Sequence, residues 1–95
     1  MLHPLIETHR QQLLTLARQR GIDNLRVFGS MARGDADANS DVDLLVSLPP
    51  GISGLALGGL LMDAQDLLGR TVDVVTESAL HPALRDQVLA TCIRL

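Results

Sequence analysis

The sequence is most informative where two apolar runs meet: Val27-Phe28-Gly29-Ser30-Met31-Ala32-Arg33-Gly34-Asp35-Ala36-Asp37-Ala38-Asn39-Ser40-Asp41-Val42-Asp43-Leu44-Leu45-Val46. The first run ends at Gly29-Ser30, a polar and turn-rich segment follows, and the second run begins with Asp41 and Asp43. Successive side chains of a strand point to opposite faces, so these two carboxylates would share one face, roughly 7 Å apart. The other face would carry apolar side chains that point into a core: Val42, Leu44 and Val46.

The residues around these carboxylates suit chemistry on a phosphate group. Neighbouring anions repel each other, and Mg²⁺ relieves this repulsion, since it binds one or two protein carboxylates and completes its octahedron with water and substrate phosphate. Gly29 allows a close backbone approach, and Ser30 adds hydrogen-bond donors at the start of a short helix. The pattern therefore predicts a metal-binding pair of carboxylates beside a phosphate-binding turn, which is the arrangement that binding a nucleoside triphosphate requires.

Each part of this pattern also has a simpler interpretation. An Asp-x-Asp pair is often a solvated strand edge or turn, and Gly-Ser after a strand is often only a turn. Arg33 either forms a salt bridge with a nearby Asp or makes a charge-assisted contact with the triphosphate. Ser40 either steadies the turn that enters Asp41 or belongs to the residues that bind the nucleotide. The specific signal is the whole arrangement of strand, Gly-Ser, ten residues, Asp-x-Asp and continuous strand.

The periodicity of the whole chain predicts one domain over residues 1–95, with the element order α-β-α-β-α-β-α. The expected fold is α/β (α+β), with a small mixed sheet of three to four strands packed by helices. The expected helices are Pro4–Arg20, Met31–Arg33, Gly54–Leu68 and Pro82–Ile93, and the expected strands are Leu25–Phe28, Val42–Ser47 and Thr71–Val75.

The last predicted strand carries one acid, Asp73, between β-branched residues. An acid in the middle of a strand is unfavourable unless something uses it. If this strand pairs beside Val42–Ser47, Asp73 can join Asp41 and Asp43 on one face.

Other expectations concern the outer elements. Asp23-Asn24 is expected to form a turn, and His3, His9 and His81 are not expected to bind metal. Gly58-Gly59 indicates either a broad buried helix face or close packing against a second protein. The last helix is expected to pack through one apolar side: Ala83, Leu84, Val88, Leu89 and Cys92.

Composition excludes several classes of function. All eight basic residues are arginine, so a lysine nucleophile and a P-loop lysine are excluded. A net charge of −3 and a single aromatic residue argue against a nucleic-acid binder, which needs a basic surface or a stacking platform. Cys92 is the only cysteine, which excludes an internal disulfide. With no signal peptide or long apolar run in the sequence, we expect a cytoplasmic protein without a membrane partner.

Gly29-Ser30, ten residues and Asp41-Val42-Asp43 together resemble the Gly-Ser-x10-Asp-x-Asp signature of the polymerase-β-like nucleotidyltransferase superfamily. The surrounding Gly29–Gly34 and Ser40–Val46 segments resemble its minimal nucleotidyltransferase (MNT) branch, the antitoxin half of HEPN–MNT toxin–antitoxin modules. The resemblance spans roughly Leu25 to Val75. It implies the polymerase-β-like fold, and Asp73 matches the third carboxylate that these enzymes carry on a neighbouring strand.

The resemblance also implies a reaction and a partner. An acceptor hydroxyl would attack the α-phosphate of ATP, with two Mg²⁺ ions held by Asp41, Asp43 and Asp73. Asp73 would in addition act as general base. Gly29 and Ser30 would grip the β- and γ-phosphates. MNT proteins of this kind attach AMP to a tyrosine of a HEPN RNase toxin and thereby neutralise it.

Two alternatives remain open at this point. A binding-only antitoxin would mask the RNase site of the toxin sterically, without catalysis. A small-molecule nucleotidyltransferase would need a helical domain to complete its acceptor pocket, and we expect 95 residues to leave no room for it unless a partner chain provides it.

Overall fold

The computed structural model describes residues 2–95, and a four-stranded sheet forms their centre. The strands are β1 (Asp23–Phe28), β2 (Val42–Ser47), β3 (Val72–Thr76) and β4 (Ile93–Arg94). They lie in the order β3-β2-β1-β4, where β1 is antiparallel to β2 and β4, and β2 is parallel to β3. The predicted α/β class with a small mixed sheet is therefore confirmed.

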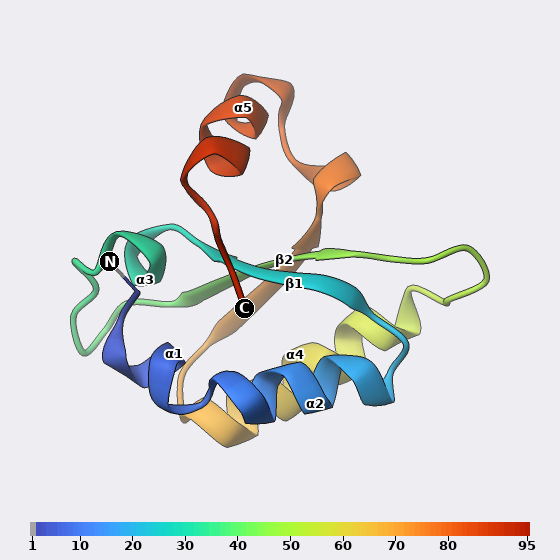
Figure 1. Cartoon of the computed structure of the whole chain (residues 1–95), viewed down its shortest axis with the longest axis horizontal. Coiled ribbons are helices and arrows are strands. Elements are labelled where there is room, and N and C mark those ends of the chain that lie inside the picture. The colour runs from blue at the N-terminus through green and yellow to red at the C-terminus, as the bar shows by residue number, and fades with distance from the viewer. Residues whose placement is uncertain (1) are drawn as a thin grey trace.

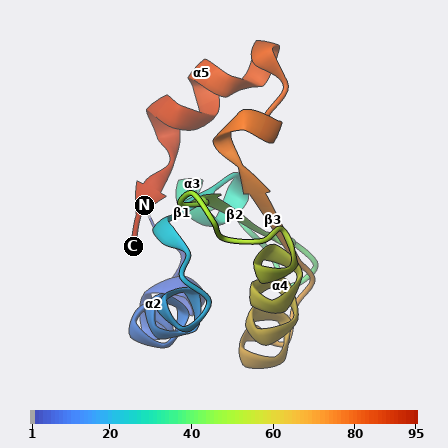
Figure 2. The same ribbon diagram turned by 90° about the vertical axis from the view of Figure 1, so that its right-hand side faces the viewer.

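Helices pack mainly on one face of this sheet. They are α1 (Pro4–Thr8), α2 (Arg10–Gln19), α3 (Ser30–Arg33), α4 (Leu55–Leu68) and α5 (Pro82–Thr91), with a 3₁₀ turn, η1 (Glu77–Ala79). α1, α2 and α4 lie below the sheet (Figure 1), whereas η1 and α5 lie on the opposite side (Figure 2). The core between the sheet and the lower helices includes fully buried residues: Ile6, Leu13, Val27, Val42, Leu44, Val46, Leu60 and Ala64.

The two elements next to the acids have the expected form. β2 has the predicted bounds, and α4 provides the long crossover that a parallel pair of strands requires. α4 ends at Gly69, whose φ of +66° is the left-handed conformation that glycine adopts at helix ends. β3 begins shortly after this turn, so the crossover returns the chain directly to the edge of β2.

The prediction of one continuous helix over Pro4–Arg20 is wrong, because the helix breaks at His9. The backbone N–H of His9 donates to the carbonyl of Ile6, three residues back. The carbonyl of Leu5, its usual helical acceptor, lies 2.7 Å from Nδ1 of His9 instead. The side chain thus replaces a helical hydrogen bond of its own backbone, and the helix divides into α1 and α2.

The ends of the sheet also differ from the prediction. Asp23-Asn24 was expected as a turn but begins β1, with Asn24 at a φ of +56° and a shift in strand register before Arg26. The last helix ends at Thr91, and Ile93–Arg94 forms β4 instead of continuing it. A strand of two residues is too short for a pattern of period two to reveal it.

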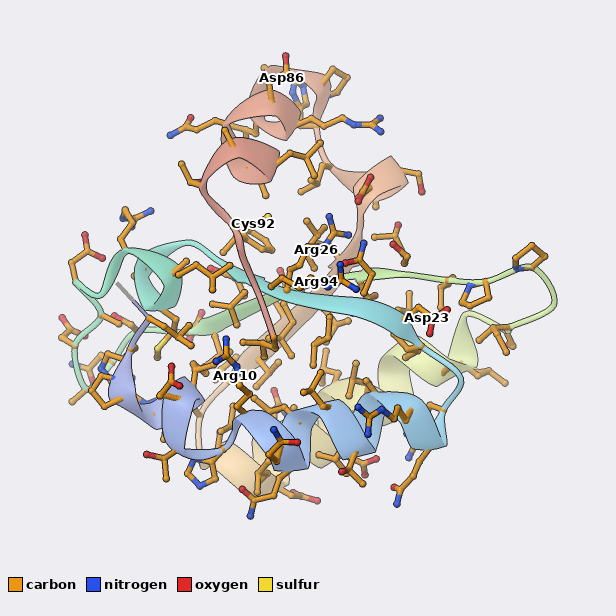
Figure 3. The ribbon with its side chains drawn as sticks, in the orientation of Figure 1. Arg10, Asp23, Arg26, Asp86, Cys92 and Arg94 are labelled. Carbon is orange, nitrogen blue, oxygen red and sulfur yellow. The ribbon has the colours of Figure 1, made fainter. Side chains whose placement is uncertain are left out.

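The last helix packs less than its apolar side predicts, since Val88, Leu89 and Cys92 are only partly buried and Ala83 and Leu84 are exposed. No residue of α5 is buried, and Leu84 is 55% exposed. His81 begins the helix, since its side chain accepts from the N–H of Ala83, and Pro82 follows at the first helical position. α5 therefore stands off the sheet, and its Asp86 points away from the rest of the molecule (Figure 3).

The glycine pair of α4 has two different surroundings. A Cβ at Gly59 would lie against the guanidinium of Arg20, which crosses from the end of α2 to Asp63 at 2.8 Å. A Cβ at Gly58 would meet nothing within 4 Å. Gly59 thus allows close packing of α2 against α4 within this chain, whereas Gly58 faces open space and is not part of a buried face. No helix among residues 2–95 has the length and apolar character needed to cross a membrane.

Candidate functional site

Three carboxylates gather where β2 and β3 begin. Asp43 of β2 and Asp73 of β3 are paired in register, so they lie side by side on one face of the sheet. Asp41 lies two residues before Asp43, directly ahead of β2. Asp41 and Asp73 are exposed, and Asp43 is half-buried. The predicted placement of Asp73 beside Asp43 is confirmed, and all three carboxylates are accessible to a ligand.

The pKa of Asp43 depends on its burial and on the charges around it. Burial raises the pKa of Asp43 above its usual value, and the negative charges of Asp73 and Asp41 raise it further. The positive charge of Arg33 partly opposes this rise in pKa. The ionised form of Asp43 is therefore disfavoured in the protein alone, and a bound cation would stabilise it.

The Gly29-Ser30 turn between β1 and α3 lies against the carboxylate of Asp43. Phe28, at the end of β1, pairs with Asp43, so the following turn passes directly over this carboxylate. Gly29 has φ +70° and ψ −150°, a combination that is essentially restricted to glycine. A Cβ at this position would lie 2.6 Å from Oδ2 of Asp43. Glycine is thus required both by the backbone conformation and by the carboxylate.

The core fixes this turn from below. Ser30 begins α3, the predicted short helix, and the next two residues, Met31 and Ala32, are buried. The carbonyl of Met31 also accepts a 2.8 Å hydrogen bond from the N–H of His3. The chain therefore holds Gly29 and Ser30 in a fixed position above the start of β2.

Arg33 forms a salt bridge with a nearby Asp, and Ser40 stabilises the turn before Asp41, as the simpler interpretation of each residue predicts. Arg33 forms an exposed ion pair with Asp35 at 3.2 Å. The hydroxyl of Ser40 accepts from the N–H of Asp37 at 2.9 Å and lies 3.2 Å from its carboxylate. These contacts order the loop between α3 and β2. Contact of either side chain with a nucleotide remains a prediction.

Arg70 is a residue of this region for which the sequence motif gives no signal. It lies between the end of α4 and β3, and its Nη1 donates to the carbonyls of Asp37 and Ser40 at 2.6 and 3.3 Å. The sequence would reveal it only through its place directly after the helix-ending Gly69.

Arg26 is a second residue that the pattern does not single out. It is 7% exposed on the same face of the sheet as Asp43, and its Nη1 lies 2.5 Å from the carboxylate of Glu77 in η1. Its other nitrogens donate to the carbonyl of Asn24 and the hydroxyl of Ser47. This ion pair, in which Arg26 is buried and Glu77 is partly exposed, joins the sheet to the segment that leads into α5, and Figure 3 shows Arg26 in the space between them.

The donor chemistry fits a hard divalent cation. Mg²⁺ commonly uses one or two protein carboxylates and takes its remaining ligands from water and phosphate, which matches neighbouring acids on an open surface. Among residues 2–95, no three His, Cys, Asp or Glu side chains form a group that could hold a metal ion by themselves. If these acids bind Mg²⁺, they would provide only part of its coordination shell, and water and substrate oxygens would complete it.

Three hollows on the surface lie away from this cluster. The one between α2 and α4 has a volume of about 420 Å³ and is lined mostly by apolar surface, including Leu16 and Leu67. A second, of about 280 Å³, lies beside the chain end at Leu95, and a third, of about 450 Å³, lies beside Glu77 and Arg85. None of the three is lined by Asp41, Asp43 or Asp73.

Comparison with known proteins gives a consistent result. Residues 6–95 match the family model described as a nucleotidyltransferase domain. Protein adenylyltransferase MntA of Thermococcus cleftensis is 36% identical over 86 residues, which are 90% of this chain and 83% of that protein. A solved structure described as a candidate minimal nucleotidyltransferase is 41% identical, with a TM-score of 0.87 over 100% of this chain and 97% of that one.

More distant structures share the fold. A toxin–antitoxin complex with AMP-PNP has a TM-score of 0.75 at 23% identity, over 88% of this chain and 69% of that one. A complex of tri-AMPylated Shewanella oneidensis HEPN toxin with MNT antitoxin has a TM-score of 0.69 at 19% identity, over 93% and 69% of the two chains.

Proposed function

Because this chain belongs to the nucleotidyltransferase domain family, we propose that it transfers AMP from ATP to a tyrosine hydroxyl of a cognate HEPN toxin and thereby neutralises it. Residues 1–95 would act as one minimal nucleotidyltransferase domain. The acceptor is proposed from the relatives: one is named a protein adenylyltransferase, and one distant structure with this fold contains a HEPN toxin that carries AMP. The nucleotide is proposed from the AMP-PNP complex, since AMP-PNP is an ATP analogue.

The observation that carries the proposal is the contact between the turn and the acids. Gly29 lies against Asp43, which is in register with Asp73, so a triphosphate on the turn would bring its phosphates to the carboxylates. The backbone of Gly29 and Ser30 and the Ser30 hydroxyl would hold the β- and γ-phosphates, because glycine lets the backbone approach a phosphate closely and the hydroxyl adds a hydrogen-bond donor. Arg33 would exchange its exposed pair with Asp35 for a phosphate oxygen, and Ser40 would hold the neighbouring loop in place.

The reaction is an in-line displacement at the α-phosphate. The tyrosine oxygen forms a bond to phosphorus, the bond from phosphorus to the bridging oxygen breaks, and pyrophosphate leaves. Asp73, the exposed acid at the edge of the sheet, accepts the proton of the tyrosine hydroxyl. Two Mg²⁺ ions, held by Asp41, Asp43 and Asp73, would neutralise the charge that develops on the attacking and leaving oxygens.

Incubation with ATP, Mg²⁺ and a cognate HEPN protein, to be sought in the neighbouring open reading frame, tests the proposal. We expect mass spectrometry to find AMP on a toxin tyrosine with the wild-type chain and none with Asp43→Asn. A matched control is Asp66→Asn, an exposed carboxylate of α4. If the folded wild-type chain leaves the folded toxin unmodified, AMP transfer to the toxin is wrong.

Neutralisation of the toxin in cells distinguishes catalysis from masking. We expect the double variant Asp41→Asn/Asp43→Asn to lose neutralisation while it still binds the toxin. If this variant protects cells as well as wild type does, the chain is a binding-only antitoxin.

A further inference from the structure

We propose that Arg70 is a positioning residue that holds Asp41 and Asp73 at their separation by fastening the loop before β2 to the segment before β3. The inference rests on the proposed function, because that function requires Asp41 and Asp73 to reach the same substrate. It assigns a role to a side chain outside the Gly-Ser and Asp-x-Asp motifs.

The first observation is that Asp41 lies outside the strand ladder. β2 begins at Val42, whose N–H donates to the carbonyl of Thr71 at 2.9 Å. Asp41 precedes this hydrogen bond and is exposed. Its position is therefore determined on one side by the sheet and on the other by the loop that leads into it.

The second observation is that the loop is closed mainly upon itself. The carboxylate of Asp37 accepts from the N–H of Asn39 at 2.8 Å, and the hydroxyl of Ser40 accepts from the N–H of Asp37 at 2.9 Å. The N–H of Ser40 also donates to the carbonyl of Asp37 at 3.2 Å. These bonds give the loop a shape, but they do not attach it to the rest of the molecule.

The start of the loop is attached through Ala36, which packs against the core, and the end next to Asp41 is attached by Arg70. One nitrogen, Nη1, donates to the carbonyl of Asp37 at 2.6 Å and to that of Ser40 at 3.3 Å, across 33 and 30 residues of sequence. Ser40 is the residue directly before Asp41. Bonds of a charged donor to backbone carbonyls are stronger than neutral ones and act on the backbone itself.

The place of Arg70 in the chain connects this loop to the second acid. Gly69 reverses the chain at the end of α4, and Arg70 then lies three residues before Asp73. The neighbouring Thr71 makes the first bond to β2. A single guanidinium thus joins the segment that carries Asp41 to the segment that carries Asp73.

The test uses Mn²⁺ as the probe and the free chain, so that it does not depend on turnover. We expect Arg70→Ala to weaken Mn²⁺ binding about 10- to 100-fold, the usual effect of removing an outer-shell partner, and to speed hydrogen exchange of the Asn39 amide. Arg70→Lys keeps a charged donor and should recover most of the affinity. The matched control is Arg10→Ala, because Arg10 donates to the carbonyl of Arg94 at 3.2 Å, and Figure 3 shows it below the sheet.

The outcomes separate this inference from the proposed function. If Arg70→Ala leaves the exchange of the Asn39 amide unchanged, or binds Mn²⁺ within about twofold of wild type while Asp41→Asn binds it poorly, Arg70 is not a positioning residue. If wild type and Asp41→Asn bind Mn²⁺ equally, the proposed metal role of Asp41 is wrong, and the positioning role of Arg70 toward it is wrong as well. In that case AMP transfer itself is still decided by the toxin experiment.

Discussion

At the scale of single residues, the acids and the glycine beside them depend on one another. Asp41, Asp43 and Asp73 could be located from the sequence because a strand alternates its faces, and because β-branched neighbours mark β3 as a strand. Their alignment also required the register of β2 on β3, which the sequence does not specify. The contact of Gly29 with Asp43 depends on the pairing of Phe28 and was visible only in the structure.

Gly29→Ala should lower both stability and activity. The backbone conformation at Gly29 costs a residue with a side chain about 1–3 kcal/mol, and the new methyl group would displace the carboxylate of Asp43. Gly58→Ala is a matched control, since its Cβ meets nothing and alanine is favoured within a helix by up to about 1 kcal/mol. Urea unfolding measures both variants. Equal stability of Gly29→Ala and wild type would contradict the geometry of this turn.

Asp43→Asn should stabilise the metal-free protein at neutral pH. The pKa of Asp43 is raised in the folded state, so folding favours its protonated form. Wild type therefore loses stability as pH rises from the usual aspartate value of about 3.9 through the raised pKa, whereas the Asn variant does not. Below that range Asp43 is protonated and neutral, as Asn is, so the pH-dependent part of the difference in stability should vanish. Thermal unfolding across pH measures it, and a difference that is the same at all pH values would contradict the raised pKa.

At the scale of elements, the errors of prediction share a physical cause. The broken helix at His9, the short β4 and the exposed α5 each depend on a contact between distant or competing groups. The His9 ring replaces a backbone donor, Leu95 donates to the carbonyl of Leu25 beside β4, and Arg26 forms an ion pair with Glu77 below α5. Periodicity describes how one segment faces a core, so it cannot report such contacts.

α5 should be the least protected long helix in hydrogen exchange. None of its residues is buried, whereas α4 buries Leu60, Ala64 and Leu68. Local opening is easier where few apolar contacts must break, so amides of α5 should exchange at least about tenfold faster than those of α4. Exchange of the free chain followed by NMR measures this. Equal protection of the two helices would show that α5 packs more tightly than its exposure indicates.

At the scale of the whole molecule, the two faces of the sheet have different tasks. The face below carries the apolar core between the strands and α1, α2 and α4, and it provides stability. The other face carries Asp43 and Asp73 at one end and the Arg26–Glu77 pair under η1 at the other. The catalytic proposal places all of its chemistry on this second face, where substitutions need not disturb the core.

ATP labelled at a single phosphate tests the central claim most directly. With label in the α-phosphate, the toxin should become radioactive in the presence of the wild-type chain and Mg²⁺, and Asp41→Asn/Asp43→Asn should abolish this labelling. With label in the γ-phosphate, the toxin should stay unlabelled, and the radioactivity released from ATP should appear in pyrophosphate. Label from the γ-phosphate on the toxin, or α-label transferred equally well by the double variant, would contradict nucleotidyl transfer by these carboxylates.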